Sequence, residues 1–128
     1  MVLKEPELFS YLKEFYYPDL TFTSDKYSTY DCVSQDNNLY IELKSRNKHY
    51  DELLIEQVKW DGLTTEARYF NLTPYYVCST PDGIWAFDLS KWKPEWEEKW
   101  LPQNTEFSAR GNKTKVVGYL HIKDGVAL

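Results

Sequence analysis

Apolar residues recur at helical spacing in two long segments of the chain. From Pro6 to Tyr16 they fall three and four positions apart, which predicts an amphipathic helix with Pro6 in its first turn. The helical pattern returns from about Tyr50 to Leu63. A short third helix is expected after Pro94, because proline is common in the first turn of a helix.

β-branched and aromatic residues predict six strands in the segments between these helices. Turn-forming residues at Gln35–Asn38 and Pro81–Gly83 join two pairs of strands into hairpins. The predicted strands are Leu20–Thr23, Tyr27–Ser34, Leu39–Ser45, Pro74–Ser79, Ile84–Leu89 and Lys115–Ile122. The order of helix, three strands, helix, two strands, short helix and strand predicts a mixed α/β domain with a central sheet flanked by helices.

Length and composition restrict the class of protein. The chain has 128 residues, so we expect a single domain over residues 1–128. A hydrophobic content of 42% argues against disorder, and no apolar run approaches the roughly 18 residues that would predict a membrane span. The first residues lack the basic start and long apolar stretch of a secretory signal, so we expect a cytoplasmic protein without membrane attachment.

Net charge and cysteine content restrict the kinds of binding surface and cysteine site that the protein can have. The net charge of -5 excludes a whole-molecule field that attracts nucleic acid, so any phosphate-binding surface must be local. The acidity does not exclude a nuclease, because carboxylates that hold a cation count as negative in the bare sequence. Cys32 and Cys78 lie in apolar, strand-like segments and are predicted to be buried thiols.

The predicted hairpin around Asp36–Asn37 brings two acidic residues together. If its strands pair antiparallel about this centre, counting outward places Asp31 directly opposite Glu42. Two carboxylates that face each other on a sheet repel, and burial under a helix would add a desolvation cost. A hard divalent cation would offset both costs, and Mg²⁺ commonly uses one or two carboxylates together with water and substrate phosphate.

Lys44 is predicted to point to the same face as Glu42, because side chains alternate along a strand. Asp31, Glu42 and Lys44 together suit phosphodiester hydrolysis, in which a cation acidifies water and a nearby lysine orients or deprotonates it. The alternative is an edge hairpin whose polar face meets water, with Lys44 neutralising the two acids. Spacing alone does not separate these two interpretations.

The segment Tyr40–Arg46, together with Asp31, resembles the PD-(D/E)XK nuclease superfamily, and most of all its archaeal Holliday-junction resolvase branch. In those resolvases a glutamate opens the first helix and an Asp lies on the second strand. Glu-x-Lys-Ser follows on the third strand, and a Glu-Gln pair lies in the next helix. The corresponding places, in the same order, hold Glu5, Asp31, Glu42–Ser45 and Glu56–Gln57. The similarity covers roughly residues 5–92, and the short helix and strand expected over 93–128 lie outside it.

The resemblance implies a restriction-endonuclease-like core and metal-dependent hydrolysis of DNA, leaving a 5′-phosphate and a 3′-hydroxyl. Asp31, Glu42, Glu5 and the Leu43 carbonyl would hold one or two Mg²⁺ or Mn²⁺ ions, and Lys44 would position or activate the water. Branched or duplex DNA would be the partner, in recombination or repair. A homodimer is a further hypothesis, because a four-way junction is itself nearly two-fold symmetric.

Two other classes of function would preserve the same residue pattern. One is a different nuclease role within the superfamily, such as restriction, exonuclease activity or RNA cleavage. The other is a catalytically silent nucleic-acid-binding module with the same fold. A structure-selective endonuclease similar to the junction resolvases is the interpretation we favour.

Helical phase selects two supporting residues. Glu5 falls on the same stripe as the inward-facing Leu8, whereas Glu7 and Glu14 fall on the opposite side of the helix. Gln57 interrupts an apolar stripe, and by resemblance it would support the metal site or its water. The alternatives are that Glu5 complements the helix dipole and that Gln57 bonds a free backbone group.

Basic and aromatic residues offer further candidates for nucleic-acid contact. Arg46 and Lys48 lie beyond the third strand and could contact phosphate, with a solvated loop as the alternative. Lys59 is interpreted as a solvated helix residue. Tryptophans that recur every four residues favour core packing over stacking on bases. These are Trp92, Trp96 and Trp100.

Overall fold

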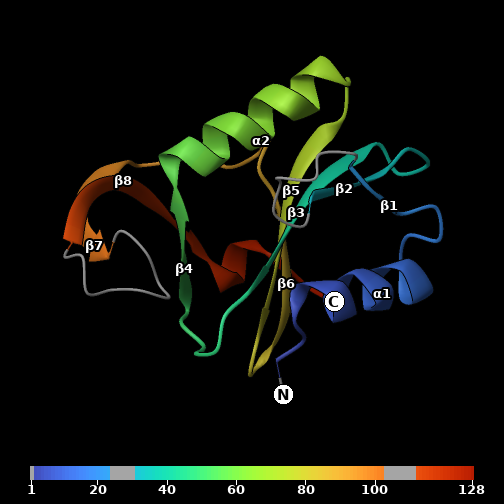
Figure 1. The fold of residues 1–128 in the computed structure, drawn as a ribbon, viewed down its shortest axis with the longest axis horizontal. Coiled ribbons are helices and arrows are strands. Elements are labelled where there is room, and N and C mark those ends of the chain that lie inside the picture. Colours follow the sequence, from blue (N-terminus) through green and yellow to red (C-terminus); the bar gives the residue numbers. More distant parts are fainter. Residues whose placement is uncertain (1, 24–30, 103–111) are drawn as a thin grey trace.

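The chain folds into two β-sheets and two α-helices, seen in the computed structural model that describes residues 2–23, 31–102 and 112–128 (Figure 1). The larger sheet has the strand order β1-β2-β3-β5-β6-β9, and the smaller has the order β4-β8-β7. The helices are α1 (Glu5–Phe15) and α2 (Gln57–Tyr69). The strands are β1 (Thr21–Phe22), β2 (Asp31–Ser34), β3 (Leu39–Ser45), β4 (Glu52–Glu56), β5 (Thr73–Thr80), β6 (Gly83–Asp88), β7 (Glu97–Pro102), β8 (Asn112–His121) and β9 (Val126–Ala127).

The two helices cover opposite faces of the six-stranded sheet (Figure 1). On one face, Leu8 and Leu12 of α1 pack in a core with Ile41 of β3, and all three side chains are buried. On the other face, Leu63 of α2 packs in a second core with Tyr76 of β5. Because side chains alternate along a strand, β3 supplies one core with its odd-numbered residues and the other with its even-numbered ones.

The central sheet is mixed, as the sequence predicts for this α/β fold. β2 and β3 are antiparallel, β3 and β5 are parallel, and β5 and β6 form the second antiparallel pair. The parallel step requires a long crossover, which α2 supplies together with β4. Both predicted hairpins and the predicted buried thiols, Cys32 and Cys78, are confirmed. Within the described segments, no helix has the length and apolar character needed to cross a bilayer.

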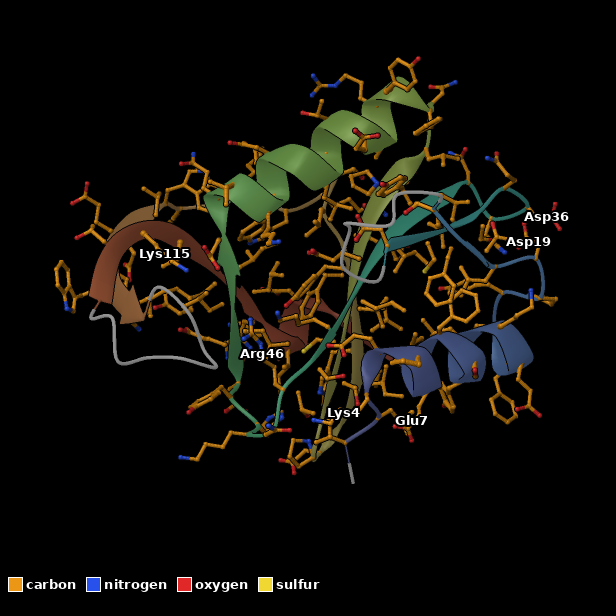
Figure 2. All side chains as sticks on the ribbon, viewed as in Figure 1. Lys4, Glu7, Asp19, Asp36, Arg46 and Lys115 are labelled. Carbon is orange, nitrogen blue, oxygen red and sulfur yellow. The ribbon has the colours of Figure 1, made fainter. Side chains whose placement is uncertain are left out.

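The tight turn between β2 and β3 fixes the register of the first hairpin. Asn38 adopts a positive φ of 59° and donates its backbone N–H to Gln35 O at 3.1 Å. Asp19, which lies beside the turn, accepts hydrogen bonds from Ser34 Oγ at 2.6 Å and from the backbone N–H of Asp36 at 2.8 Å (Figure 2). These bonds hold the pairing of Ser34 with Leu39, from which the rest of the ladder follows.

The helix predicted from about Tyr50 begins only at Gln57, and the residues before it form β4 instead. Leu53 and Ile55 are buried with half-exposed or exposed residues on either side, which is the alternation of a strand. A short apolar run is ambiguous between the two structures, so local spacing misassigned it. Pairing with β8, which is distant in sequence, decides in favour of the strand.

The prediction of a short helix after Pro94 is also wrong, because this segment forms the strand β7. Trp92 and Trp96 form an edge-to-face pair, with ring centroids 5.8 Å apart, against Gly118 of β8. This confirms packing for these two tryptophans, whereas Trp100 is 64% exposed. Phe15 is 63% exposed although its spacing predicted an inward position, and residues 27–30 of the predicted second strand lie outside the described residues.

Substitution of Gly118 by alanine is expected to destabilise the protein by about 1–3 kcal/mol, the usual cost of overpacking. An added Cβ would lie 3.0 Å from Trp92 Cη2 and 3.1 Å from Trp96 Cζ3. Gly62→Ala is the matched control, because its Cβ would meet nothing within 4 Å and alanine favours the interior of α2 by roughly 0.5–1 kcal/mol. Urea unfolding of both variants measures the difference, and equal stabilities would contradict the close packing on β8.

Candidate active site

The centre of the candidate site is a pair of carboxylates on adjacent strands. Asp31 of β2 lies directly opposite Glu42 of β3, which is the register that the sequence predicts. Glu42 is only 8% exposed, and it shares its face of the sheet with Tyr40 and Lys44. Ile41 belongs to the core on the opposite face, so the face that carries Glu42 is the one covered by α2.

Burial and charge both perturb the acidity of Glu42. Desolvation is the largest effect, and the negative charge of Asp31 adds to it, raising the pKa of Glu42 from 4.5 to about 7. The positive charges of Lys59, Lys44 and Arg46 act in the opposite direction and lower this pKa. The site therefore holds a carboxyl group that is poorly satisfied as an anion and would be stabilised by a bound cation.

Glu42 opens into a pocket with a volume of about 190 Å³. Five different elements or their ends contribute to this pocket, which lies between the end of β3 and the start of both helices. Its charged lining consists of Glu5, Glu42, Lys44, Arg46, Glu56 and Lys59. Leu43 also lines it, which brings backbone of β3 into reach of a ligand beside Glu42.

Glu5 is the first residue of α1, and its side chain lines the pocket. Its Oε1 atom accepts a hydrogen bond from the backbone N–H of Ser45 at 3.2 Å. Leu3, two residues before Glu5, is held by two hydrogen bonds, because its backbone N–H donates to Ser79 Oγ and its carbonyl accepts from Ser45 Oγ. Glu7 is exposed, so the helical phase identified the acid that reaches the site.

Arg46 forms part of the pocket wall, which excludes the solvated-loop alternative for this residue. Its backbone N–H donates to Ser79 O at 2.8 Å, and its Nη2 donates to Leu54 O at 3.1 Å. The side chain thereby crosses from the end of β3 to β4, beside which it appears in Figure 2. Lys48 is exposed in the loop after β3, and its contact with phosphate stays a prediction.

The start of α2 adds two residues that sequence reasoning did not assign to the site. Glu56 and Lys59 both line the pocket, and Lys59 lowers the pKa of Glu42 although its own side chain is exposed. Glu56 and Lys59 are three residues apart at the start of α2, which places both on one face of its first turn. The sequence did not reveal this, because its pattern predicted a helix that begins at about Tyr50. Gln57 is half-buried at the first position of α2, and its supporting role stays a prediction.

The donor set suits a hard divalent cation better than a soft one. Among the described residues, no group of three or more His, Cys, Asp and Glu side chains lies close enough together to hold a metal ion. The site instead offers the opposed carboxylates of Asp31 and Glu42, the neighbouring Glu5 and backbone oxygen at Leu43. Mg²⁺ is commonly held by one or two carboxylates and completes its shell with water and phosphate, so this set fits it.

The raised pKa of Glu42 predicts how stability depends on pH without divalent cations. Between pH 4.5 and about 7, the folded protein keeps a proton on Glu42 that the unfolded chain loses, so the free energy of unfolding falls as pH rises. We expect a loss of about 3 kcal/mol across this window. Urea unfolding in chelator from pH 4 to 8 measures it.

Glu42→Gln and Glu14→Gln provide the comparison for that experiment. The first substitution should remove this component of the pH dependence, whereas the second replaces an exposed acid of α1 and should preserve it. Identical pH profiles for Glu42→Gln and the wild type would show that Glu42 has an ordinary pKa.

Comparison with known proteins identifies a fold. The structure is similar to that of Hjc, a Holliday junction resolvase from the archaeal hyperthermophile Archaeoglobus fulgidus, with a TM-score of 0.64 and 16% sequence identity. The similarity covers 97% of this chain and 88% of Hjc. No protein-family model matches the sequence, and no curated protein matches it either. The chain therefore has the fold of this resolvase, which supports the nuclease fold that the sequence motifs predict.

Proposed function

We propose that this protein is a metal-dependent nuclease that hydrolyses phosphodiester bonds in DNA. The observation that carries this proposal is the strand register that places Asp31 opposite the buried Glu42, which lines one charged pocket together with Lys44. Opposed acids destabilise a sheet and a buried carboxylate adds to that cost, so a structural role alone gives no reason for this arrangement. The similarity in fold to a Holliday junction resolvase supports the same activity.

Each site residue predicted from the sequence has a distinct role in this mechanism. Asp31, Glu42 and the Leu43 carbonyl would hold a divalent cation, Mg²⁺ or Mn²⁺, and Glu5 would help to hold a second cation or the substrate side of the site. When bound, such a cation acidifies water and neutralises charge that develops on the phosphate. Lys44, on the same face as Glu42, orients the attacking water or accepts its proton.

The remaining steps determine the products. Water oxygen bonds to phosphorus while the bond from phosphorus to the 3′-oxygen breaks, and the 3′-oxygen takes up a proton. This leaves a 5′-phosphate and a 3′-hydroxyl, as the family resemblance implies. Gln57 would orient the inner ligands from the start of α2, and Arg46 and Lys48 would contact neighbouring phosphates.

Branched DNA is the substrate class we favour, with cleavage selected by structure. Hjc is described as a Holliday junction resolvase, and the similarity extends over nearly the whole of this chain. Because a four-way junction is nearly two-fold symmetric, two active sites related by a two-fold axis would suit it, and we propose a homodimer. Gel filtration checks this, and a monomer under all loading conditions would contradict it.

A panel of labelled substrates tests the proposed activity. We expect purified protein to cleave four-way junctions in Mg²⁺ or Mn²⁺, more rapidly than flap, duplex, single-stranded DNA or RNA, and not in chelator. Asp31→Ala and Lys44→Ala should be inactive while they still bind DNA. If wild type and both variants are equally inert but bind, the protein is a silent binding module. If another nucleic acid is cleaved best, the chemistry stands and the junction preference is wrong.

A further inference from the structure

A second pocket adjoins the candidate active site on the side of the small sheet. It has a volume of about 450 Å³ and lies between the end of β3 and the β4-β8-β7 sheet. Lys44, Arg46, Leu54 and Glu56 line both pockets, so the two are contiguous. A polymeric ligand bound at Glu42 would therefore extend into this second pocket.

The second pocket is locally basic in a protein whose net charge is -5. Its charged lining consists of Lys44, Arg46, Lys99 and Lys115 on the basic side and Glu52 and Glu56 on the acidic side. Four cationic groups against two carboxylates leave an excess of positive charge in a partly enclosed space. Such a surface raises the local concentration of anions even when the whole molecule is acidic.

The positive charge is concentrated by the register of the small sheet. Lys99 of β7 lies directly opposite Lys115 of β8 in the antiparallel ladder. Like charges directly opposite one another are destabilising. The two lysines therefore repel each other as the opposed acids Asp31 and Glu42 do, but with positive instead of negative charge. A bound anion is the natural counter-ion for such a pair. Figure 2 shows Lys115 below the arch of β7 and β8 and Arg46 beside β4.

The contacts of the two lysines differ in a way that leaves donors for a ligand. Lys115 Nζ forms an ion pair with Glu56 at 3.4 Å, which offsets its charge in part. Lys99 Nζ instead donates to the neutral Tyr119 hydroxyl at 2.7 Å, and in the described part of the chain it forms no ion pair with a carboxylate. An ammonium group has three donors, and a tyrosine that accepts one bond keeps its own O–H for donation. Lys99, Lys115 and Tyr119 can thus converge on one multi-oxygen anion.

We propose that Lys99, Lys115 and Tyr119 form a subsite that binds a phosphate of the DNA strand flanking the cleaved bond. This inference rests on the proposed nuclease function for its ligand, because a phosphodiester chain carries regularly spaced anions from one pocket to the next. Lys99, Lys115 and Tyr119 lie beyond residues 5–92, the part of the sequence that resembles the resolvase family. The subsite makes the small sheet a positioning element for substrate rather than a purely structural addition.

DNA binding at several salt concentrations tests the subsite. Fluorescence anisotropy of a labelled duplex and a labelled four-way junction is measured with the full chain in an Asp31→Asn background, which prevents cleavage. Lys99→Gln and Lys115→Gln should each weaken binding roughly three- to tenfold at low salt. Each should also reduce the slope of log Kd against log salt by about 0.9, the value for one lost phosphate contact.

Lys93→Gln is the matched control, because Lys93 is exposed between the two tryptophans that pack against Gly118. It should leave both affinity and salt slope close to those of the parent. If Lys99→Gln and Lys115→Gln match this control, the subsite is overturned. If an acidic polypeptide displaces the DNA as effectively as unlabelled DNA does, the pocket is a general anion surface and the proposal is also overturned.

The outcome is independent of whether the protein cleaves DNA. Lost affinity and a reduced slope support the subsite even if the wild type proves inert, in which case only the nuclease proposal fails. Cleavage by wild type with unchanged binding in both lysine variants would overturn the subsite alone. Tyr119→Phe removes the hydroxyl while keeping the ring, and we expect a smaller loss of affinity with an unchanged salt slope, because it removes no charge.

Discussion

Glu42→Gln is expected to lower the single-turnover rate of DNA cleavage by at least about 10³-fold. A bound cation supplies several kcal/mol of transition-state stabilisation, and each 1.36 kcal/mol is a factor of ten in rate. Glutamine retains the size of the side chain but loses the negative charge that would hold the cation. Because Glu42 lies opposite Asp31, Asp31→Asn should produce a loss of similar size.

The stability of Glu42→Gln distinguishes lost chemistry from lost structure. Glu42 is buried beside another acid, so its replacement by a neutral amide should leave the melting temperature unchanged or raise it at pH 8 in chelator. Added Mg²⁺ should stabilise the wild type and have little effect on the variant. Glu14→Gln on the exposed side of α1 is the control for both measurements. Cleavage by Glu42→Gln at the wild-type rate would rule out the carboxylate pair as the active site.

Lys44→Gln is expected to reduce the cleavage rate by about 10² to 10⁴-fold, the usual contribution of a positioned acid–base group. Lys44 lies on the same face as Glu42, two residues along β3, and lines the same pocket. Its loss also removes a charge that lowers the pKa of Glu42. We therefore expect the acidic limb of the pH–rate profile to move to higher pH, as well as a lower maximal rate.

Lys59→Gln separates the two effects of removing a lysine. Lys59 also lowers the pKa of Glu42, but its side chain is exposed on α2. Its substitution should shift the acidic limb in the same direction while reducing the maximal rate less than about tenfold, because exposed charges are screened. Equal losses of maximal rate in Lys44→Gln and Lys59→Gln would mean that Lys44 acts only through its charge.

The pairing of the two acids at the centre of the candidate site was predictable because it depends on a local structure. Asp31 and Glu42 belong to one hairpin, and a short turn fixes every pair along its ladder once the central residues are known. Helical phase likewise separated Glu5 from Glu7, since both belong to one helix whose period is fixed. In each case the relevant neighbours are close in sequence, so backbone geometry alone sets their relation.

The remaining parts of the site depend on contacts between distant segments. β4 is a strand because β8 pairs with it, and local spacing around Leu53 fits a helix equally well. The start of α2 follows from that assignment, and with it the places of Glu56 and Lys59 in the pocket. The short helix expected after Pro94 was wrong for the same reason, since pairing with the distant β8 makes this segment the strand β7.

The sequence by itself therefore determined the acidic pair, the lysine beside it and the helix that carries Glu5. Periodicity and turn chemistry act over a few residues, and these features need nothing more. Only the tertiary structure decided that Glu42 is buried, that Arg46 crosses to β4 and that Lys99 faces Lys115. Burial and electrostatic environment arise from segments far apart in the chain, because side-chain packing and strand pairing are properties of the whole fold.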